Sequence, residues 1–235
     1  MMATTRPPHI SASILNADFS QLGAEVRRAV DGGVDSVHLD VMDGHFVDNI
    51  TMGPLVVEAL RPHAALPYHS HLMISQPLAY VRAFADAGSD VVIFHLEADD
   101  DPDAVLAEIR AAGRTGGLAI NPETPAEAAL PFLDRIGMLL VMTVNPGWGG
   151  QPFMTEVLPK LRQLRAEAER RGLDLPIGVD GGVSAATIGR AYAAGGDVLV
   201  TGKALYGNDG DLRQVVDQLR AAATAGAASA ESAAS

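Results

Sequence analysis

Ionisable side chains alternate with aliphatic ones along the segment 36–42. In a β-strand successive side chains point to opposite faces, so His38, Asp40 and Met42 would share one face and Leu39 and Val41 the other. A buried carboxylate is stable only when it is paired or bound to a metal. The segment therefore predicts a strand that supplies an imidazole and a carboxylate to a functional site. Taken alone, it is equally compatible with a buried structural pair.

Two further segments favour the functional interpretation. The segment 67–74 places His69, His71 and Met73 on one strand face, and an apolar run much later in the chain ends at Asp180, before two glycines. Imidazole nitrogens and carboxylate oxygens near several strand ends suit one divalent metal ion. This mixed set of ligands does not discriminate among Zn, Fe, Mn and Co.

The bulk composition limits the possible partners. The 235 residues, 48% of them hydrophobic, suit a single domain, and no cysteine is present to form a disulfide or act as a nucleophile. A formal charge of −12, from 17 Lys and Arg against 29 Asp and Glu, argues against nucleic acid and anionic membranes as partners. We find no signal peptide and no apolar run of the roughly 18 residues that span a bilayer, so we expect a soluble, cytoplasmic protein.

Apolar β-branched runs alternate with amphipathic stretches along the chain. The runs predict eight strands, at 9–14, 36–41, 67–73, 91–96, 117–120, 138–144, 177–180 and 198–201. The stretches between them predict helices at 19–31, 54–60, 77–87, 103–112, 125–133, 152–171, 185–194 and 211–222. Eight strand-helix units in this length favour one (β/α)8 TIM barrel, whose active site lies at the C-terminal ends of the strands.

We expect the barrel domain to cover residues 9–220. Residues 1–8 are predicted to be a flexible N-terminus. From residue 221 the chain is rich in Ala and Ser and offers little to pack, so residues 221–235 are predicted to be a disordered tail.

Glycine-rich loops follow the last three predicted strands. Such loops suit a phosphate group, because glycine lets backbone amides approach an anion. The predicted phosphate contacts are Gly147, Gly149, Gly150, Gly181, Gly182 and Gly202. Lys203 would add a cationic contact, although a solvated surface lysine fits the same position. Tight strand-helix connections also use glycine for conformation alone.

These features together resemble the ribulose-phosphate 3-epimerase family, over nearly the whole chain up to about Arg220. The matching segments are 11–15, 38–46, 49–51, 71–73, 94–98, 142–147, 149–151 and 179–182. The resemblance implies a TIM barrel of the ribulose-phosphate-binding type. It also implies a metal-dependent isomerase that interconverts D-ribulose 5-phosphate and D-xylulose 5-phosphate through an enediolate.

The resemblance further implies roles for single residues. It implies that His38, Asp40, His71 and Asp180 bind one divalent metal ion, and that the two aspartates also act as acid and base. It implies that the substrate is contacted by Ser13, His71, Met42, Met73 and Met142. Inversion needs one base on each face of the substrate, and carboxylates from the second and seventh strands would flank it. Family members are often dimers or hexamers, so we expect a homo-oligomer in carbohydrate metabolism, such as the pentose phosphate pathway.

Three positions depart from the family pattern. Pro is usual at Asp48, Phe at Trp148 and a small residue at Lys203. The last bears on substrate identity, and the segments 120–125 and 151–153 also resemble the sister enzyme that epimerises D-allulose 6-phosphate. That substrate remains an alternative, as does a catalytically silent sugar-phosphate sensor. Decarboxylation in related barrels needs a lysine among the acids of the second strand, and this chain has none there.

The remaining histidines have simpler interpretations. We expect His69 to have a core or rim role and His45 to be part of loop structure. His95 and Glu97 are predicted to form a second layer around the site or a structural pair, rather than to bind the metal.

Overall fold

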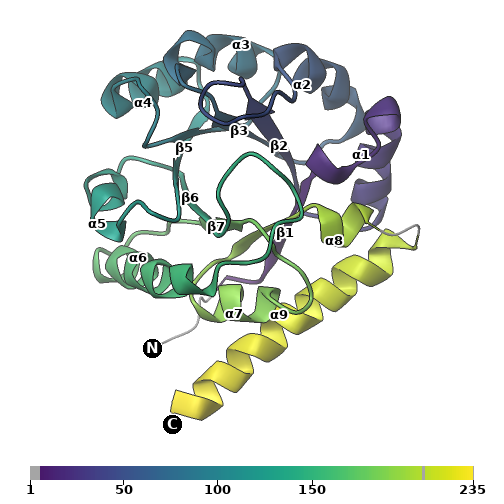
Figure 1. Ribbon diagram of the computed structural model, residues 1–235, viewed down its shortest axis with the longest axis vertical. Coiled ribbons are helices and arrows are strands. Elements are labelled where there is room, and N and C mark those ends of the chain that lie inside the picture. The colour runs from purple at the N-terminus through teal and green to yellow at the C-terminus, as the bar shows by residue number, and fades with distance from the viewer. Residues whose placement is uncertain (1–5, 208–209, 235) are drawn as a thin grey trace.

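The computed structural model of the chain describes residues 6–207 and 210–234. Parallel strands form a closed barrel in the order β1-β2-β3-β4-β5-β6-β7-β8 (Figure 1). The strands are β1 His9–Ser13, β2 Ser36–Met42, β3 Tyr68–Met73, β4 Val91–His95, β5 Thr115–Ile120, β6 Met138–Met142, β7 Ile177–Asp180 and β8 Val198–Thr201. The predicted (β/α)8 fold is confirmed, because β1 pairs with both β2 and β8 and so closes the ring.

Helices surround the barrel. They are α1 Leu22–Asp31, α2 Pro54–Leu60, α3 Val81–Asp86, α4 Pro102–Ala111, α5 Ala126–Ala129, α6 Leu158–Arg170, α7 Ile188–Ala193, α8 Lys203–Tyr206 and α9 Leu212–Ala234. Three predicted helices have a 3-10 turn before the α-helix instead, at Phe19–Gln21, Pro77–Ala79 and Thr155–Val157. The single-turn helix α8 was not predicted, since four residues are too few to show an amphipathic period.

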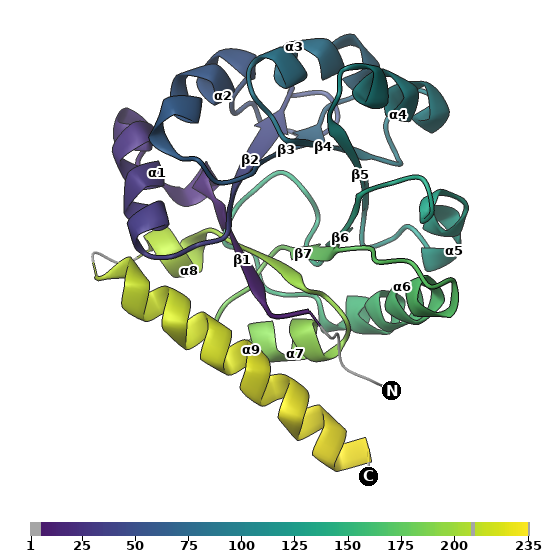
Figure 2. The ribbon, with the colours of Figure 1, turned by 180° about the vertical axis from the view of Figure 1, so that it is seen from behind.

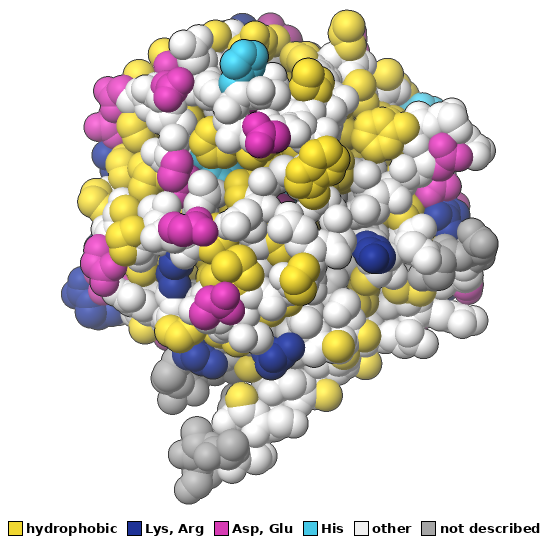
Figure 3. All heavy atoms as spheres, viewed as in Figure 1, with side chains coloured by type: hydrophobic (Ala, Val, Ile, Leu, Met, Phe, Trp, Pro, Cys, Tyr) yellow, Lys and Arg dark blue, Asp and Glu magenta, His cyan; other side chains and the backbone are white. Residues whose placement is uncertain are grey.

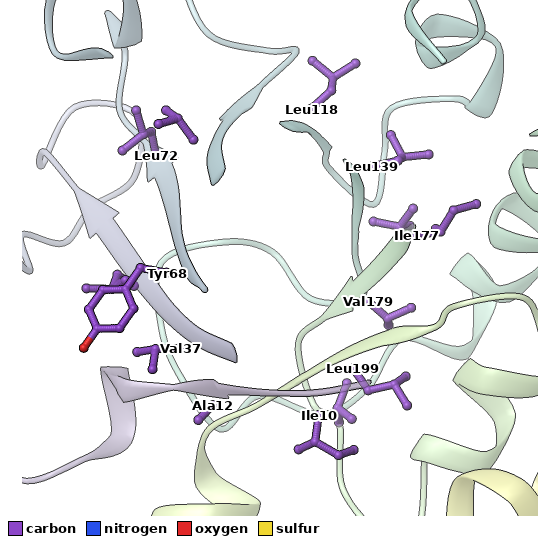
Figure 4. Close-up of a cluster of buried hydrophobic side chains, with 14 of the residues drawn as sticks. Ile10, Ala12, Val37, Tyr68, Leu72, Leu118, Leu139, Ile177, Val179 and Leu199 are labelled. Atoms are coloured by element: carbon purple, nitrogen blue, oxygen red, sulfur yellow. The ribbon is translucent and has the colours of Figure 1, made fainter. Parts of the chain in front are cut away.

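Strand alternation divides the core into two parts. The outward side chains of the strands pack against the helices in one continuous cluster, and Figure 4 shows several of them around the ring, among them Leu72, Leu139 and Val179. Inward aliphatic and methionine side chains of β4, β5, β6 and β8 form a second cluster inside the barrel. On β1, β2 and β3 the inward positions are instead largely polar, with His38 and Asp40 both buried. This polar sector lies opposite the apolar filling and needs internal partners.

Strand register brings the predicted site residues to one level. Asp40 on β2 pairs with His71 on β3, and Met142 on β6 pairs with Asp180 on β7. Because all the strands are parallel, their carboxyl ends lie at one end of the barrel. The loop after β6, coloured green, crosses this end in Figure 1, and Figure 2 shows the start of β1 at the opposite end.

The C-terminal segment differs from the prediction. Instead of a disordered tail from residue 221, the chain continues as helix α9 through Ala234, which packs against α7 and extends beyond the barrel in both ribbon views (Figures 1 and 2). Alanine has the highest helix propensity, and Ala223 and Ala227 are buried against the barrel. The prediction of disorder from low apolar content was therefore wrong, because closely packed small side chains hold this helix against α7.

The N-terminal segment is described only from Arg6, so residues 1–5 of the predicted flexible N-terminus lie outside the described residues. Arg6 forms ion pairs with Asp174 and Asp197. The chain is therefore attached to the barrel three residues before β1 begins.

Membrane-spanning helices and the distribution of basic side chains both bear on possible partners. No helix within residues 6–207 and 210–234 is long and apolar enough to cross a membrane. On the face shown in Figure 3, Lys and Arg side chains are scattered singly and do not gather into a patch. This distribution agrees with the acidic composition.

Candidate metal centre and active site

Four side chains from three strands converge at the carboxyl end of the barrel. One ligand atom each from His38, Asp40, His71 and Asp180 lies within 4.8 Å of the other three. His38 Nε2 is 3.2 Å from His71 Nδ1 and 3.4 Å from Asp40 Oδ1. His71 Nδ1 is 3.3 Å from the same Asp40 oxygen. Asp180 Oδ2 completes the group, at 3.6 Å from His38 Nε2 and 3.5 Å from His71 Nδ1.

These distances fit a metal ion. A regular tetrahedron around a cation with ligand distances of about 2.0–2.1 Å has edges of about 3.3–3.4 Å. The five edges given above range from 3.2 to 3.6 Å. The two imidazole nitrogens face each other beside two carboxylates, and hydrogen bonds among these four groups do not satisfy all of their lone pairs. The group is therefore preorganised for a divalent cation with nitrogen and oxygen ligands.

Electrostatics within the group favour charged forms. Burial alone would lower the pKa of His71, but hydrogen bonds and charge from Asp180 and Asp40 outweigh it and raise the pKa to about 9. Burial would raise the pKa of Asp40, yet the neighbouring His38 and His71 hold it well below its ordinary value. The two directions agree: the Asp40 carboxylate is ionised, and a proton on His71 occupies the place of a cation.

Two hydroxyl groups hold Asp40. Ser13 Oγ donates to Asp40 Oδ2 at 2.6 Å, so the carboxylate oxygen that faces away from His71 is also occupied. Thr51 Oγ1 donates to the backbone oxygen of Asp40 at 2.5 Å and accepts from the Met42 N–H at 3.0 Å. The loop after β2 therefore ties back onto its own strand and fixes the end of β2.

A cavity of about 70 Å³ opens in front of the two aspartates. Most of the predicted substrate contacts line it, and they come from strand ends and loops of both halves of the chain. They are Ser13, Met42, Met73, Met142, Gly147, Gly149, Gly150, Gly181, Gly182, Gly202 and Lys203. His38 and His71 do not line this cavity, and both are fully buried behind the carboxylates. This position suits His71 as a metal ligand and does not support the predicted contact between His71 and substrate.

The loops after β6 and β7 approach so closely that glycine is required at Gly181 and Gly182. Their φ angles are +114° and +67°. A Cβ at Gly181 would lie 2.9 Å from the backbone nitrogen of Val144, and one at Gly182 would lie 2.6 Å from that of Phe153. Backbone amides are thus brought to the cavity wall without side chains in between, as an anion site needs.

Asn16 lies between two of the glycine loops. A Cβ added at Gly149 would meet Asn16 Nδ2 at 2.8 Å, and one at Gly202 would meet Asn16 Oδ1 at 2.5 Å. We did not predict Asn16 as a site residue from the sequence, although its polar side chain follows Ser13 by only three positions. Lys203 lies along the next glycine, with its Cδ 3.0 Å and Nζ 3.6 Å from a Cβ added at Gly150.

The comparison with known sequences identifies the family. The family model described as the ribulose-phosphate 3 epimerase family matches residues 9–206, which is most of the chain. The chain belongs to this family. Among its relatives is the ribulose-phosphate 3-epimerase of Bacillus subtilis, 44% identical over 212 residues, which cover 90% of this chain and 97% of that protein. The enzyme of the same name from Escherichia coli is 41% identical, covering 90% of this chain and 94% of that protein.

Solved structures agree with the epimerase fold. A 3-hexulose-6-phosphate synthase from Salmonella typhimurium superimposes with a TM-score of 0.68 at 18% sequence identity, covering 93% of this epimerase and 99% of that chain. A tryptophan synthase structure from Mycobacterium tuberculosis gives 0.65, also at 18% identity, with 93% of each chain covered. At such low identity the likeness concerns the barrel alone.

The other histidines of the epimerase have the roles expected of them. His69 is buried at the far end of the barrel, where its ring stacks on His9 at 6.1 Å between centroids. Burial lowers the pKa of His69 to about 3. His45 is exposed on the loop after β2, and its Nδ1 lies 3.0 Å from the Asp43 carbonyl oxygen. Neither residue belongs to the group of four ligand side chains.

His95 and Glu97 are closer to the site than a structural pair would require. His95 Nε2 is 2.9 Å from His71 Nε2, and His95 Nδ1 is 3.1 Å from Glu97 Oε2. Burial lowers the pKa of His95 to about 4. Burial also opposes ionisation of Glu97, but hydrogen bonds, first from His95 and then from Asn121 N–H, hold its pKa below the ordinary value. The pair is therefore a neutral imidazole and a carboxylate.

Proposed function

We propose that this member of the family interconverts D-ribulose 5-phosphate and D-xylulose 5-phosphate, with His38, Asp40, His71 and Asp180 holding one divalent ion. The observation that carries the proposal is the near-tetrahedral set of distances among the four ligand atoms, directly behind a cavity with two carboxylates in its wall. The choice of substrate follows the name that its relatives carry, and the glycine-rich loops suit the phosphate group of that substrate. Zn, Fe, Mn and Co are all compatible with two nitrogens and two oxygens.

The reaction removes a weakly acidic proton from the carbon beside the ketone and returns one to the opposite face. A bound divalent ion would act as a Lewis acid that stabilises the negative charge of the enediolate. Asp40 extends from β2 and Asp180 from β7, and both line the cavity. We assign one to each face of the substrate, so that the base in one direction is the acid in the other.

Side chains around the carboxylates exclude water. Met42 and Met73 are register partners on β2 and β3 and pack with Val47, and Met142 faces the same cavity from β6. Thioethers are polarizable and make only weak hydrogen bonds, so they border a developing anion without competing for its proton. Asn49 Nδ2 donates to the Gly147 carbonyl at 2.8 Å, which links the loops after β2 and β6 above this wall.

We place the phosphate among the glycines of the loops after β6, β7 and β8, with Lys203 as its cationic contact. The protein would act as a homo-oligomer, a dimer or a hexamer, in the cytoplasm and within the pentose phosphate pathway. Residues 9–220 would be the catalytic barrel, with the remainder of α9 as its extension.

The decisive test is a coupled assay of the metal-reconstituted protein on D-ribulose 5-phosphate beside D-allulose 6-phosphate, with a chelator control. We expect chelator-sensitive turnover of the pentulose phosphate. A preference for the hexulose phosphate would retain the mechanism and change the substrate. No turnover of either sugar by protein that holds its metal would favour a silent sensor.

The two-base assignment has its own test. Asp40→Asn and Asp180→Asn should each lower turnover by at least about 1,000-fold, because each removes a base and a metal ligand together. Metal content is measured alongside, so that loss of the ion is separated from loss of the base. Turnover within a few-fold of the parent in either variant would reject the assignment.

A further inference from the structure

Three buried side chains form a row of hydrogen bonds behind the metal group. His71 Nε2 lies 2.9 Å from His95 Nε2, and His95 Nδ1 lies 3.1 Å from Glu97 Oε2. The two imidazole rings are stacked, with centroids 5.0 Å apart and planes 22° from parallel. The Phe46 ring lies 4.9 Å from the His95 ring and closes the row from the side of the β2 loop. Water has no access to His71 or His95, so each nitrogen depends on its neighbour in the row.

The far end of the row is anchored to the loop between β5 and α5. Glu97 Oε1 accepts a 2.8 Å hydrogen bond from the Asn121 N–H and another from the Thr124 hydroxyl. Lys160 Nζ donates to the carbonyl oxygens of Asn121 and Pro122, at 2.8 and 2.7 Å, and holds the loop in place. Both carboxylate oxygens of Glu97 therefore act as acceptors in fixed directions.

The row has only one arrangement of hydrogens that leaves a metal ligand on His71. A carboxylate has no hydrogen to give, so His95 Nδ1 must be the donor to Glu97. Two nitrogens 2.9 Å apart share a single hydrogen, and a His71 whose Nδ1 keeps its lone pair for a metal ion must supply that hydrogen, so His95 Nε2 is the acceptor. His71 must then carry its hydrogen on Nε2. Its Nδ1 lone pair is left facing Asp40 and Asp180.

We propose that Glu97 and His95 are positioning residues that select the Nε2–H tautomer of His71 and thereby present Nδ1 to the metal ion. This inference rests on the proposed metal site. Carboxylate-supported histidines are better metal ligands, because the hydrogen bond fixes the ring and raises the basicity of the coordinating nitrogen. The β5–α5 loop, which contributes no residue to the cavity wall, thus influences the metal through Glu97.

The support is specific to one of the two histidine ligands. Among the residues that the structure describes, His38 Nδ1 is buried without a hydrogen-bond partner. The row behind His71 is therefore not a general consequence of burying an imidazole in this barrel.

Metal affinity of Glu97→Gln tests the inference without use of turnover. The amide keeps the size of the carboxylate but has one acceptor oxygen, so it cannot accept from both His95 and the loop. We expect the affinity for Zn²⁺, titrated into metal-free protein against a chromophoric chelator, to fall by about 10- to 100-fold. Glu123→Gln is the matched control, because it removes the same charge from an exposed position on the same loop. It should change the affinity by less than about twofold.

A second measurement needs no variant. Nitrogen-15 NMR of the zinc-loaded parent protein, with labelled histidine, should show a hydrogen on Nε2 of His71 and on Nδ1 of His95. The opposite tautomer at either ring would overturn the inference, even if Glu97→Gln proved too unstable to titrate.

The outcomes separate this inference from the proposed function. A parent protein that fails to bind Zn²⁺ would reject the metal site itself. A parent that binds Zn²⁺, with Glu97→Gln binding equally tightly, would reject the role of the row and leave the epimerase assignment intact.

Discussion

Ser13 Oγ donates to the oxygen of Asp40 that faces away from the two histidines, so the two oxygens of this carboxylate have different partners. Oδ1 is directed at the metal group. Oδ2, at 2.6 Å from the hydroxyl, is held in one orientation beside the cavity. The family resemblance assigned Ser13 to the substrate, and the structure adds a contact to the proposed base. A residue that touches both can couple substrate binding to the orientation of the carboxylate.

Ser13→Ala should therefore lower kcat more than it changes KM. Loss of one hydrogen bond to a charged group corresponds to roughly tenfold or more in rate, about 1.4–3 kcal/mol. Steady-state kinetics in both directions measure the effect. Ser11→Ala is the control on the same strand, since the Ser11 hydroxyl accepts from Ser36 and does not line the cavity. An equal loss of kcat in both variants would mean that the effect is structural.

Metal uptake should release a proton and strengthen as pH rises. In the metal-free protein the pKa of His71 is raised to about 9, so a cation must displace the proton from this imidazole at neutral pH. Between pH 6.5 and 8.5 we expect the apparent affinity to rise by up to tenfold per pH unit. Calorimetric titration in buffers with different ionisation enthalpies counts the protons released. A pH-independent affinity would contradict this prediction.

The same shift predicts how the metal-free protein responds to pH. The folded-state pKa of His71 lies above its ordinary value of 6.5, so the stabilisation from its proton is complete below that pH. It is lost as pH rises through about 9. Thermal denaturation of chelated protein should show Tm decreasing over this interval, and the zinc-loaded protein should not show the same decrease. An equal decrease in both forms would assign the effect to another group.

Lys203→Met should weaken phosphate binding. The Lys203 side chain lies along Gly150 and lines the cavity beside the glycines among which we place the phosphate. We expect KM for the sugar phosphate to rise roughly tenfold, ~1.4 kcal/mol, with kcat changed by less than about threefold. Lys203→Arg keeps the charge and should recover most of the affinity. Inorganic phosphate as a competitive inhibitor gives an independent measure, and an unchanged inhibition constant would place Lys203 outside the phosphate site.

Close packing of α9 on α7 can be tested with a bulky residue. A Cβ added at Gly226 would lie 2.3 Å from Gly189 Cα, so the two backbones touch. Gly226→Val should force the helices apart and destabilise the protein by about 1–3 kcal/mol, measured by denaturant unfolding. Ala225→Val places the same side chain on the exposed face of the helix. Similar destabilisation by both would show that helix propensity, and not packing against α7, sets the cost.

The sequence predicted the barrel well because apolar β-branched runs mark the strands and amphipathic stretches separate them. Polar residues at inward positions of 36–42 and 67–74 indicated the metal group. The contact between His71 and His95 was not predictable, because it depends on the stagger between β3 and β4 and on two ring orientations. The predicted ends of the strands indicate neither the stagger nor the orientation of the rings.

Other differences have physical causes of the same kind. Asn16 lies at the site only because it contacts the loops at Gly149 and Gly202, which are over 130 residues away along the chain. The continuation of the predicted helix 211–222 through Ala234 was missed because its stabilising contacts are between small side chains and glycine. These contribute little to hydrophobic patterning and much to packing when backbones come close.

The distribution of the four ligands over the barrel also has a consequence during protein synthesis. His38, Asp40 and His71 come from β2 and β3, whereas Asp180 ends β7 and the ring closes only when β8 pairs with β1. A nascent chain therefore carries three of the four ligands from the addition of His71 until Asp180 has been added. The complete binding site, and with it any selectivity among cellular metals, can form only after nearly all of the barrel has left the ribosome.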